Sequence, residues 1–217
     1  MDADALLRRG AAELAPHLDE QQLLALHRYV ALLQRWNSTY NLTAVRDPDA
    51  MLTRHLLDSL AVAPHLDEQR ILDVGSGAGL PGVVLAIACP RREFHLLDSN
   101  GKKTRFLFQV KTALRLDNMN VHQARVEAFR PELPFDAVLS RAYAALRDMV
   151  AGCRHLLAED GRFLAMKGTY PAGELADLPG DCRVTGVTPL DVPGLDEQRH
   201  LIEIRLRPQQ QDTTGDG

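Results

Sequence analysis

At its most informative point the chain reads Ile71-Leu72-Asp73-Val74-Gly75-Ser76-Gly77-Ala78-Gly79-Leu80-Pro81-Gly82. A short β-prone segment that contains one acid leads into a turn with glycines at alternate positions, and an apolar run from Val83 to Ala88 has the character of a helix. Glycine lets the backbone approach a ligand closely, and the free N–H groups of a helix N-terminus point at that ligand. The stretch therefore predicts the strand, turn and helix of a nucleotide-type binding site.

Strands and helices alternate downstream of this turn. We predict strands over 70–74, 93–97, 119–123, 135–140 and 161–166, and helices over 81–89, 101–115, 125–129 and 145–157. This alternation is typical of a mostly parallel sheet with helices on both faces and a ligand at the carboxyl ends of the strands. Two later β-prone segments, 182–189 and 200–206, are expected to form a hairpin that closes one sheet edge and brings the total to seven strands.

The pattern divides the chain into three parts. Residues 1–66 are predicted to form a helical extension, with apolar residues at helical spacing from Leu23 to Trp36, Asp19 as an N-cap, and a further helix over 47–60 that starts at Asp47-Pro48. Residues 67–207 hold the alternating elements. The polar segment 208–217 is expected to be disordered.

The composition is that of an ordinary globular protein, with 45% hydrophobic residues and a net charge of −4. The longest apolar run has seven residues, too few to span a membrane, and the first residues are acidic where a signal peptide would be basic. Three cysteines, far apart, suit neither a disulfide framework nor a zinc site. We therefore expect a cytoplasmic protein without a metal, and we take it to be a monomer.

The charge is unevenly distributed along the chain. Between Arg91 and Lys167 there are 14 Lys or Arg against 9 Asp or Glu, whereas the other residues carry 11 basic and 20 acidic side chains. A basic middle region in an acidic protein suits a polyanionic ligand bound at one face.

Two nucleotide folds use a glycine-rich turn of this kind. Gly77 to Gly82 fits the dinucleotide pattern G-x-G-x-x-G, but Asp73 lies inside the strand, two residues before Gly75, as in the first motif of class I methyltransferases. Asp98 ends the second strand, where a carboxylate accepts the ribose hydroxyls in either fold. Because no length remains for a dehydrogenase's substrate domain, we favour a Rossmann-like class I methyltransferase that uses S-adenosylmethionine.

The residues after the fourth strand narrow the methyl acceptor. They read Ser140-Arg141-Ala142-Tyr143, without the Asn/Asp-Pro-Pro-aromatic motif usual for exocyclic amines, and Cys89 and Cys153 lie in helical patterns away from a pyrimidine-methylating position. Guanine N7 needs neither device, because its lone pair lies in the ring plane and no proton has to leave. Another RNA or a small molecule as substrate, or a non-catalytic RNA-binding assembly factor, remain alternatives.

Several motifs, in order, resemble the bacterial 16S rRNA (guanine-N7) methyltransferase G family, also called glucose-inhibited division protein B. They are Asn41-Leu42-Thr43, Arg54-His55-Leu56-Leu57-Asp58-Ser59-Leu60, the 72–82 turn, Leu97-Asp98-Ser99-Asn100-Gly101-Lys102-Lys103, Ser140-Arg141-Ala142, Met166-Lys167-Gly168 and Glu197-Gln198-Arg199-His200. The resemblance implies transfer of the methyl of S-adenosylmethionine to N7 of guanine 527, in the 530 loop of 16S rRNA. The rRNA would be part of the small subunit or of an assembly intermediate.

The resemblance also implies roles for individual residues. Asp73, Gly75, Gly77, Gly79 and Leu80 would form the cofactor loop, Asp98 would hold the ribose, the backbone of Val126 and Glu127 would frame the adenine, and Arg141 would reach the cofactor or the base. Arg125 and Arg199 would lie at the catalytic mouth, where guanidinium groups suit phosphate or a guanine edge.

Other residues near these motifs allow a functional and a structural interpretation. Lys102, which shares a helix face with Arg105 and Gln109, is expected to contact phosphate, and Lys167 ends a strand on the same side. Trp36 and Tyr40 could stack a flipped base, although packing of the helical extension is the favoured role of Trp36. His55 and Asp58 are expected to form a structural cap or a hydrogen-bonded pair.

Overall fold

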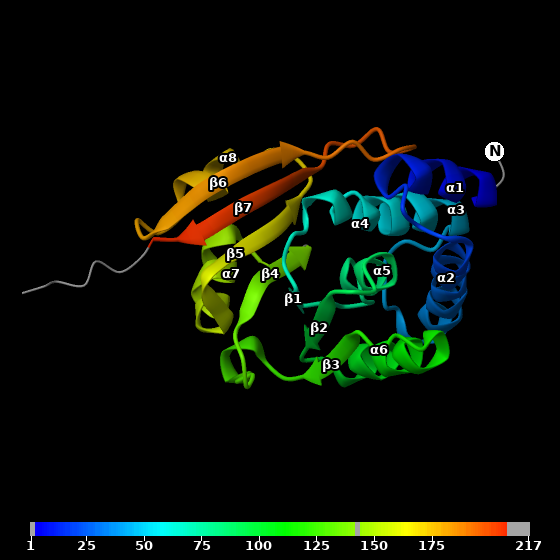
Figure 1. Cartoon of the computed structure of the whole chain (residues 1–217), viewed down its shortest axis with the longest axis horizontal. Helices are drawn as coiled ribbons and strands as arrows, with labels where there is room; N and C mark the ends of the chain where they lie inside the picture. The colour runs from blue at the N-terminus through cyan, green and yellow to red at the C-terminus, as the bar shows by residue number, and fades with distance from the viewer. Residues whose placement is uncertain (1–2, 142–143, 208–217) are drawn as a thin grey trace, which may run out of the picture.

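The computed structural model describes residues 3–141 and 144–207. Its centre is a seven-stranded sheet in the order β3-β2-β1-β4-β5-β7-β6 (Figure 1). The strands are β1 (Arg70–Val74), β2 (Glu93–Asp98), β3 (Met119–Gln123), β4 (Phe135–Arg141), β5 (Leu157–Lys167), β6 (Cys182–Pro189) and β7 (His200–Leu206). β1 to β5 are parallel, and β7 runs antiparallel to its neighbours β5 and β6. The mostly parallel seven-stranded sheet is confirmed, and the predicted hairpin closes it with β6 at the edge.

Helices connect the strands and lie close to their predicted positions. They are α5 (Gly82–Ala88), α6 (Gly101–Leu114), the 3₁₀ turn η3 (Val126–Ala128), α7 (Leu146–Cys153), the 3₁₀ turn η4 (Arg154–Leu156) and α8 (Ala172–Ala176). β5 starts four residues earlier than predicted, because its register against β4 shifts between Phe135 and Ala137 and accommodates the segment before Arg162. The helix predicted over 145–157 is correspondingly shorter, and the short α8 was not predicted.

The segment before β1 is helical. It contains α1 (Ala3–Leu14), α2 (Glu20–Tyr40), α3 (Pro48–Met51), the π-helical turn η1 (Leu52–Leu57), α4 (Asp58–Leu60) and the 3₁₀ turn η2 (Ala63–His65). Asp19 caps α2 in a capping box with Gln22, and Asp47 caps α3 ahead of Pro48, as predicted. The helix predicted over 47–60 is interrupted by η1, however. The side chains after this π turn therefore point in other directions than they would in a regular α-helix.

Two apolar cores cover the two faces of the sheet. On one face α4, α5 and α6 pack with α1 and α2 around buried residues such as Leu26, Leu56, Val83 and Phe106. On the other face α7 packs over β-strand residues such as Phe163. The N-terminal helices thus share the core of the sheet, and the domain boundary at residue 66 stays a prediction.

The tail 208–217 lies outside the described residues. Among the residues that are described, none of the helices is both long and apolar enough to cross a membrane.

Candidate active site

The glycine-rich turn between β1 and α5 is built at the carboxyl edge of the sheet. Gly75, Gly77 and Gly79 have positive φ values of 66°, 59° and 91°, which other L-residues rarely adopt. A β-carbon on Gly79 would lie 2.4 Å from Val83 Cγ2, so this position also lacks space for a side chain. The Tyr29 hydroxyl of α2 donates to the Ala78 carbonyl at 2.8 Å, which ties the helical extension to the turn.

Asp73 holds the start of α5 against β1. Its Oδ2 accepts from the Gly82 N–H at 3.0 Å, and a β-carbon at residue 82 would lie 2.6 Å from the same oxygen. Its Oδ1 is buried with no hydrogen-bond partner among the described residues, and burial raises the pKa of Asp73 to about 7. Asp73 lines neither of the cavities described below. The carboxylate therefore positions the turn and does not itself line a cavity.

A first cavity, the β2-side cavity, lies beside the ends of β1, β2 and β3. It has a volume of about 380 Å³, and its lining includes Gly75, Asp98, Lys103, Arg125, Val126 and Glu127. Asp98 Oδ2 accepts from the Gly77 N–H at 2.9 Å, and its Oδ1 accepts from the Asn100 N–H at 2.8 Å. Each carboxylate oxygen keeps a further lone pair for a ligand hydroxyl. Asp98 thus couples the glycine turn to a polar cavity, and its role as a ribose ligand stays a prediction.

Lys103, rather than Lys102, faces this cavity. The Lys103 ammonium lies 3.7 Å from Asp98 Oδ2, whereas the exposed Lys102 does not belong to the lining. Asn100 caps α6 by accepting from the Lys102 N–H, and this cap sets which residue of the first turn points inward. The sequence signal, two adjacent lysines, cannot distinguish the two positions.

A second cavity, the arginine cavity, adjoins the first at Gly75. Its volume is about 490 Å³. It is lined by Leu42, Thr43, Arg54, Asp58, Gly75, Ser76, Gly77, Ala78, Leu80, Arg141, Met166, Lys167, Gly168 and Arg199. The predicted residues Leu80, Arg141, Lys167 and Arg199 therefore meet in one hollow.

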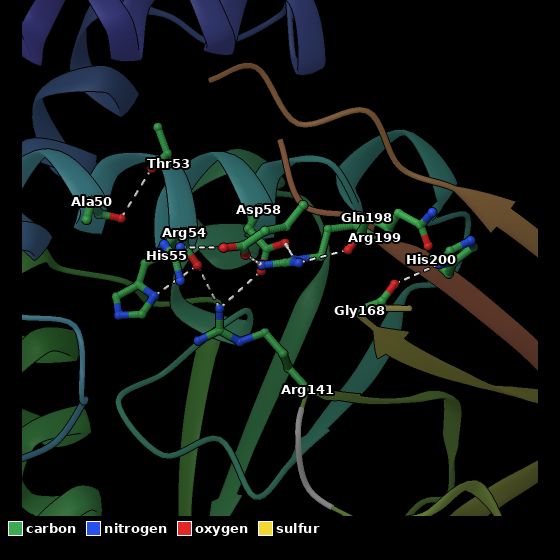
Figure 2. Close-up of polar contacts among 11 residues, drawn as sticks. Ala50, Thr53, Arg54, His55, Asp58, Arg141, Gly168, Gln198, Arg199 and His200 are labelled. Atoms are coloured by element: carbon green, nitrogen blue, oxygen red, sulfur yellow. Dashed lines mark hydrogen bonds and ion pairs between the residues drawn. The ribbon is translucent and has the colours of Figure 1, made fainter. Parts of the chain in front are cut away.

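Asp58 joins the arginines of this cavity (Figure 2). Its buried carboxylate accepts from Arg141 Nη1 at 3.1 Å on Oδ2 and from Arg199 Nε at 2.8 Å on Oδ1. Glu197 pairs with Arg54 and, at 3.0 Å, with Arg199 Nη2. Three guanidinium groups and two carboxylates leave this cluster with one net positive charge. We call these five residues, Arg54, Asp58, Arg141, Glu197 and Arg199, the arginine cluster.

The π turn η1 gives Arg141 a second acceptor. In an α-helix the Asp58 N–H would bond to the Arg54 carbonyl, but here it points to the carbonyls of Thr53 and His55. The Arg54 carbonyl accepts from Arg141 Nη1 at 3.1 Å instead. The altered turn therefore places both a carbonyl and a carboxylate around one guanidinium nitrogen.

His55 and Asp58 do not pair with each other, contrary to the sequence-based expectation. His55 Nε2 lies 2.8 Å from Thr43 Oγ1, and Nδ1 lies 3.0 Å from the Arg54 carbonyl, so Nδ1 carries the proton. Burial, followed by the charge of Arg141, lowers the pKa of His55 to about 4. The π turn separates the two side chains, so that one supports the 43–45 loop and the other supports the arginines.

The structure also places the remaining candidates. Arg125 is exposed beside the β2-side cavity, and Lys167 Nζ donates to Glu174 Oε2 at 2.7 Å and to the Ala144 carbonyl at 3.1 Å. Trp36 packs on Phe106 of α6, with ring centroids 5.6 Å apart, in a structural role. The lining of the arginine cavity also includes three residues for which the sequence predicts no role, Thr43, Arg54 and Met166.

The excess of Lys and Arg in residues 91–167 predicts one basic face. The structure instead disperses these side chains over the protein. Arg92 and Arg162 bond to Glu68 at the opposite edge of the sheet, and Arg154 pairs with Asp181. The arginine cavity draws two of its cations, Arg54 and Arg199, from outside residues 91–167. Folding rather than local composition concentrates the positive charge there.

Solved structures share this fold at low sequence identity. A glycopeptide N-methyltransferase, MtfA, matches with a TM-score of 0.57 and 14% identity over 69% of this chain and 94% of its own. A coclaurine N-methyltransferase bound to S-adenosylhomocysteine matches with a TM-score of 0.54 and 14% identity over 87% of this chain and 74% of its own. These likenesses confirm the predicted class I methyltransferase fold.

Other proteins have a much higher sequence identity to this chain than these solved structures do. Ribosomal RNA small subunit methyltransferase G of Pseudomonas paraeruginosa is 56% identical over 200 residues, which cover 92% of this chain and 94% of the relative. The protein of the same name from an Enterobacter species is 52% identical and covers 92% and 95%. Residues 22–202 match the family described as GidB, rRNA small subunit methyltransferase G. The chain therefore belongs to the rRNA small subunit methyltransferase G family.

Proposed function

We propose that this protein transfers the methyl group of S-adenosylmethionine to N7 of guanine 527 in the 530 loop of 16S rRNA. The observation that carries the proposal is the junction of two cavities at Gly75, one with the Asp98 carboxylate and one with the arginine cluster. A cofactor in the first cavity and a base in the second would meet at the glycine turn. Family membership supports the same reaction class.

The residues of the β2-side cavity fit the cofactor. Asp98 retains acceptor capacity for the two ribose hydroxyls, and the backbone beside Val126 and Glu127 offers polar groups to an adenine. Gly75 and Gly77 would let the chain approach the methionine part without a β-carbon in the way. When bound, S-adenosylmethionine supplies a methyl group on a positively charged sulfur, and the C–S electron pair stays with sulfur as the N7 lone pair forms the new N–C bond.

The arginine cluster would orient the guanine and balance its charge. Arg141 bonds to Asp58 and to the Arg54 carbonyl through Nη1, so its Nη2 has no partner among the described residues and can reach guanine O6 or a phosphate oxygen. Methylation leaves a positive charge on the base. Because Asp58 and Glu197 offset two of the three guanidinium charges, the cavity opposes that charge less than free arginines would.

No general base or nucleophile is required by this reaction. The N7 lone pair attacks directly, and no proton leaves. The cysteines lie outside both cavities, and burial raises the pKa of the Cys153 thiol to about 12. These positions disfavour a covalent mechanism at a pyrimidine carbon, which needs a cysteine thiolate at the target base.

We propose 16S rRNA in the small subunit, or in an assembly intermediate, as the partner of a cytoplasmic monomer. The alternatives are methylation of another RNA or of a small molecule, and a non-catalytic role in subunit assembly. Labelled S-adenosylmethionine with small subunits from cells that lack this protein separates them. We expect one label per subunit, at a site cleaved by chemistry specific for N7-methylguanine; label in another RNA or at another atom would contradict the proposal.

Two variants assign the two cavities in the same assay. Asp98→Asn should weaken cofactor binding, because an amide offers one acceptor oxygen where the carboxylate offers two. Arg141→Ala should retain cofactor binding and the fold but lose turnover. Wild-type methylation by Arg141→Ala would remove Arg141 from the site.

A further inference from the structure

Helices α2 and α6 carry positive charge without any acid over long stretches. Residues 21–46 contain no Asp or Glu but include Arg28, Arg35 and Arg46, and residues 99–116 likewise contain none but include five Lys or Arg. The whole chain has a net charge of −4, and α1 pairs its Arg8 with Asp4 and Glu20. An ordinary solvated helix mixes both signs of charge. These two helices pack against each other (Figure 1), so that the exposed basic residues Arg28 and Arg35 of α2 and Lys102 and Arg105 of α6 lie on neighbouring elements.

We propose that the exposed side of these helices binds rRNA outside the target nucleotide, an inference that rests on the proposed function. We define the α2–α6 face by Arg35 and Tyr40 of α2 and Lys102, Arg105 and Gln109 of α6, all exposed. The face would add affinity and orientation, while the chemistry stays in the cavities at the glycine turn.

A hollow on this face has the features of a base-stacking site. It has a volume of about 360 Å³ and is lined by Leu32, Arg35, Trp36, Thr39, Tyr40 and Gln109. The ring centroids of Trp36 and Tyr40 lie 5.2 Å apart, and the Trp36 ring also packs against Phe106 of α6. Tyr40 is 41% exposed and lines the hollow, where an aromatic ring can stack on an unpaired base.

The basic side chains lead from this hollow toward the active site. Gln109, Arg105 and Lys102 follow one another at spacings of four and three residues on one side of α6. The N-terminus of α6 follows Asp98 by three residues, and the chain after α2 continues into Leu42 and Thr43 of the arginine cavity. A 14-residue helix is about 21 Å long, enough to contact several phosphates of a strand that enters the site.

This combination of groups selects single-stranded RNA as the partner. Guanidinium and ammonium groups bind the phosphates, and an aromatic ring stacks on a base, as in proteins that bind unpaired strands. The partner would be the rRNA segment that flanks the methylated guanine. An acidic protein would use the charge but would leave the stacking hollow unused.

The test uses a double charge reversal, Arg35→Glu with Arg105→Glu. The control, Arg9→Glu with Arg183→Glu, makes the same change of net charge at exposed positions on α1 and β6. We measure the KM for small subunits, the kcat, and the affinity for S-adenosylmethionine. We expect the α2–α6 variant to raise the KM by about tenfold or more over the control, because two phosphate contacts become repulsive, with kcat and cofactor affinity unchanged.

Salt and stacking provide two further readouts. Loss of two phosphate contacts should reduce the slope of log KM against log salt concentration by about 1.5. Tyr40→Ala should raise the KM by about fivefold or more, whereas Tyr40→Phe keeps the ring and should not.

The outcomes separate this inference from the proposed function. A KM equal to that of the control, or a fall in kcat at unchanged KM, would overturn the docking role of the α2–α6 face. The affinity of the same variants for small subunits can also be measured by a binding assay without methyl transfer. If the wild-type protein shows no methylation, the proposed function fails, and this binding assay still decides the docking role.

Discussion

Asp58→Ala removes the carboxylate that holds two arginines at the arginine cavity. Asp58 is 4% exposed in its side chain, and its partners Arg141 and Arg199 are 22% and 19% exposed. Hydrogen bonds to charged groups contribute about 1.5–3 kcal/mol each, and the two guanidinium groups can recover some water. We therefore expect the lower end for both bonds, about 3 kcal/mol of unfolding free energy. For a chain of this size that is a fall in Tm of about 6–12 °C.

The same substitution should affect turnover more than cofactor binding. Without Asp58 the guanidinium groups lose their fixed positions, and a displacement of about 1 Å at a reacting group costs about 100-fold in rate. The β2-side cavity does not include Asp58, so affinity for S-adenosylmethionine should stay near the wild-type value. We expect kcat to fall about 100-fold at saturating subunits, measured well below the lowered Tm.

The control is Asp136→Ala, at the opposite edge of the sheet. Asp136 Oδ2 accepts from the Arg70 N–H at 2.8 Å, so its loss should reduce stability without changing kcat. Asp58→Asn keeps the shape and one acceptor oxygen and should fall between wild type and Asp58→Ala in both measurements. If Asp58→Ala loses the expected stability but retains wild-type kcat, the carboxylate has only a structural role and the reasoning is refuted.

Gly82→Ala would place a β-carbon 2.6 Å from Asp73 Oδ2, so cofactor binding measured by calorimetry should weaken by about tenfold. The control Gly173→Ala, where a β-carbon would have nothing within 4 Å, should bind the cofactor normally. Equal affinities of the two variants would contradict the role of Asp73. The pKa of His55 is lowered to about 4, so the folded protein holds fewer protons than the unfolded chain between this value and 6.5, and stability rises with pH across that window. His55→Gln should therefore remove about 2 kcal/mol of the stability difference between pH 5 and pH 7 in urea unfolding, and an unchanged difference would show that His55 titrates normally. Replacing all three cysteines by alanine should leave kcat unchanged, and loss of methylation by a folded triple variant would point to a thiol in the mechanism.

The sequence predicts the parallel sheet and the cofactor turn because both depend on local patterns. Alternating apolar segments mark the strands, and the positive φ values of the turn between Asp73 and Gly82 favour the glycines found there. The bulge in β5 and the start of α8 have no such local signal. They depend on how β4 and β5 align and on where the chain packs after the sheet has formed.

The arginine cluster was predicted only in part because it is assembled from distant segments. Asp58 and Arg199 are 141 residues apart in the chain. Asp58 lies in a segment with an apolar helical pattern, which predicts packing against the core and gives no sign of a charge pair. Nothing in residues 47–60 signals a π turn, yet this turn rotates Asp58 toward Arg141 and His55 toward Thr43. Tertiary contacts, rather than residue spacing, decide which of these side chains reach the site.

The most direct test of the central claim is the methylation state of guanine 527 in cells. Cleavage specific for N7-methylguanine, read by primer extension on 16S rRNA, would be compared in a strain lacking the gene, the strain complemented with wild type, and the strain complemented with Arg141→Ala. The account predicts a stop at this guanine only with the wild-type protein. A stop in the strain lacking the gene, or equal stops with both complementing proteins, would contradict it.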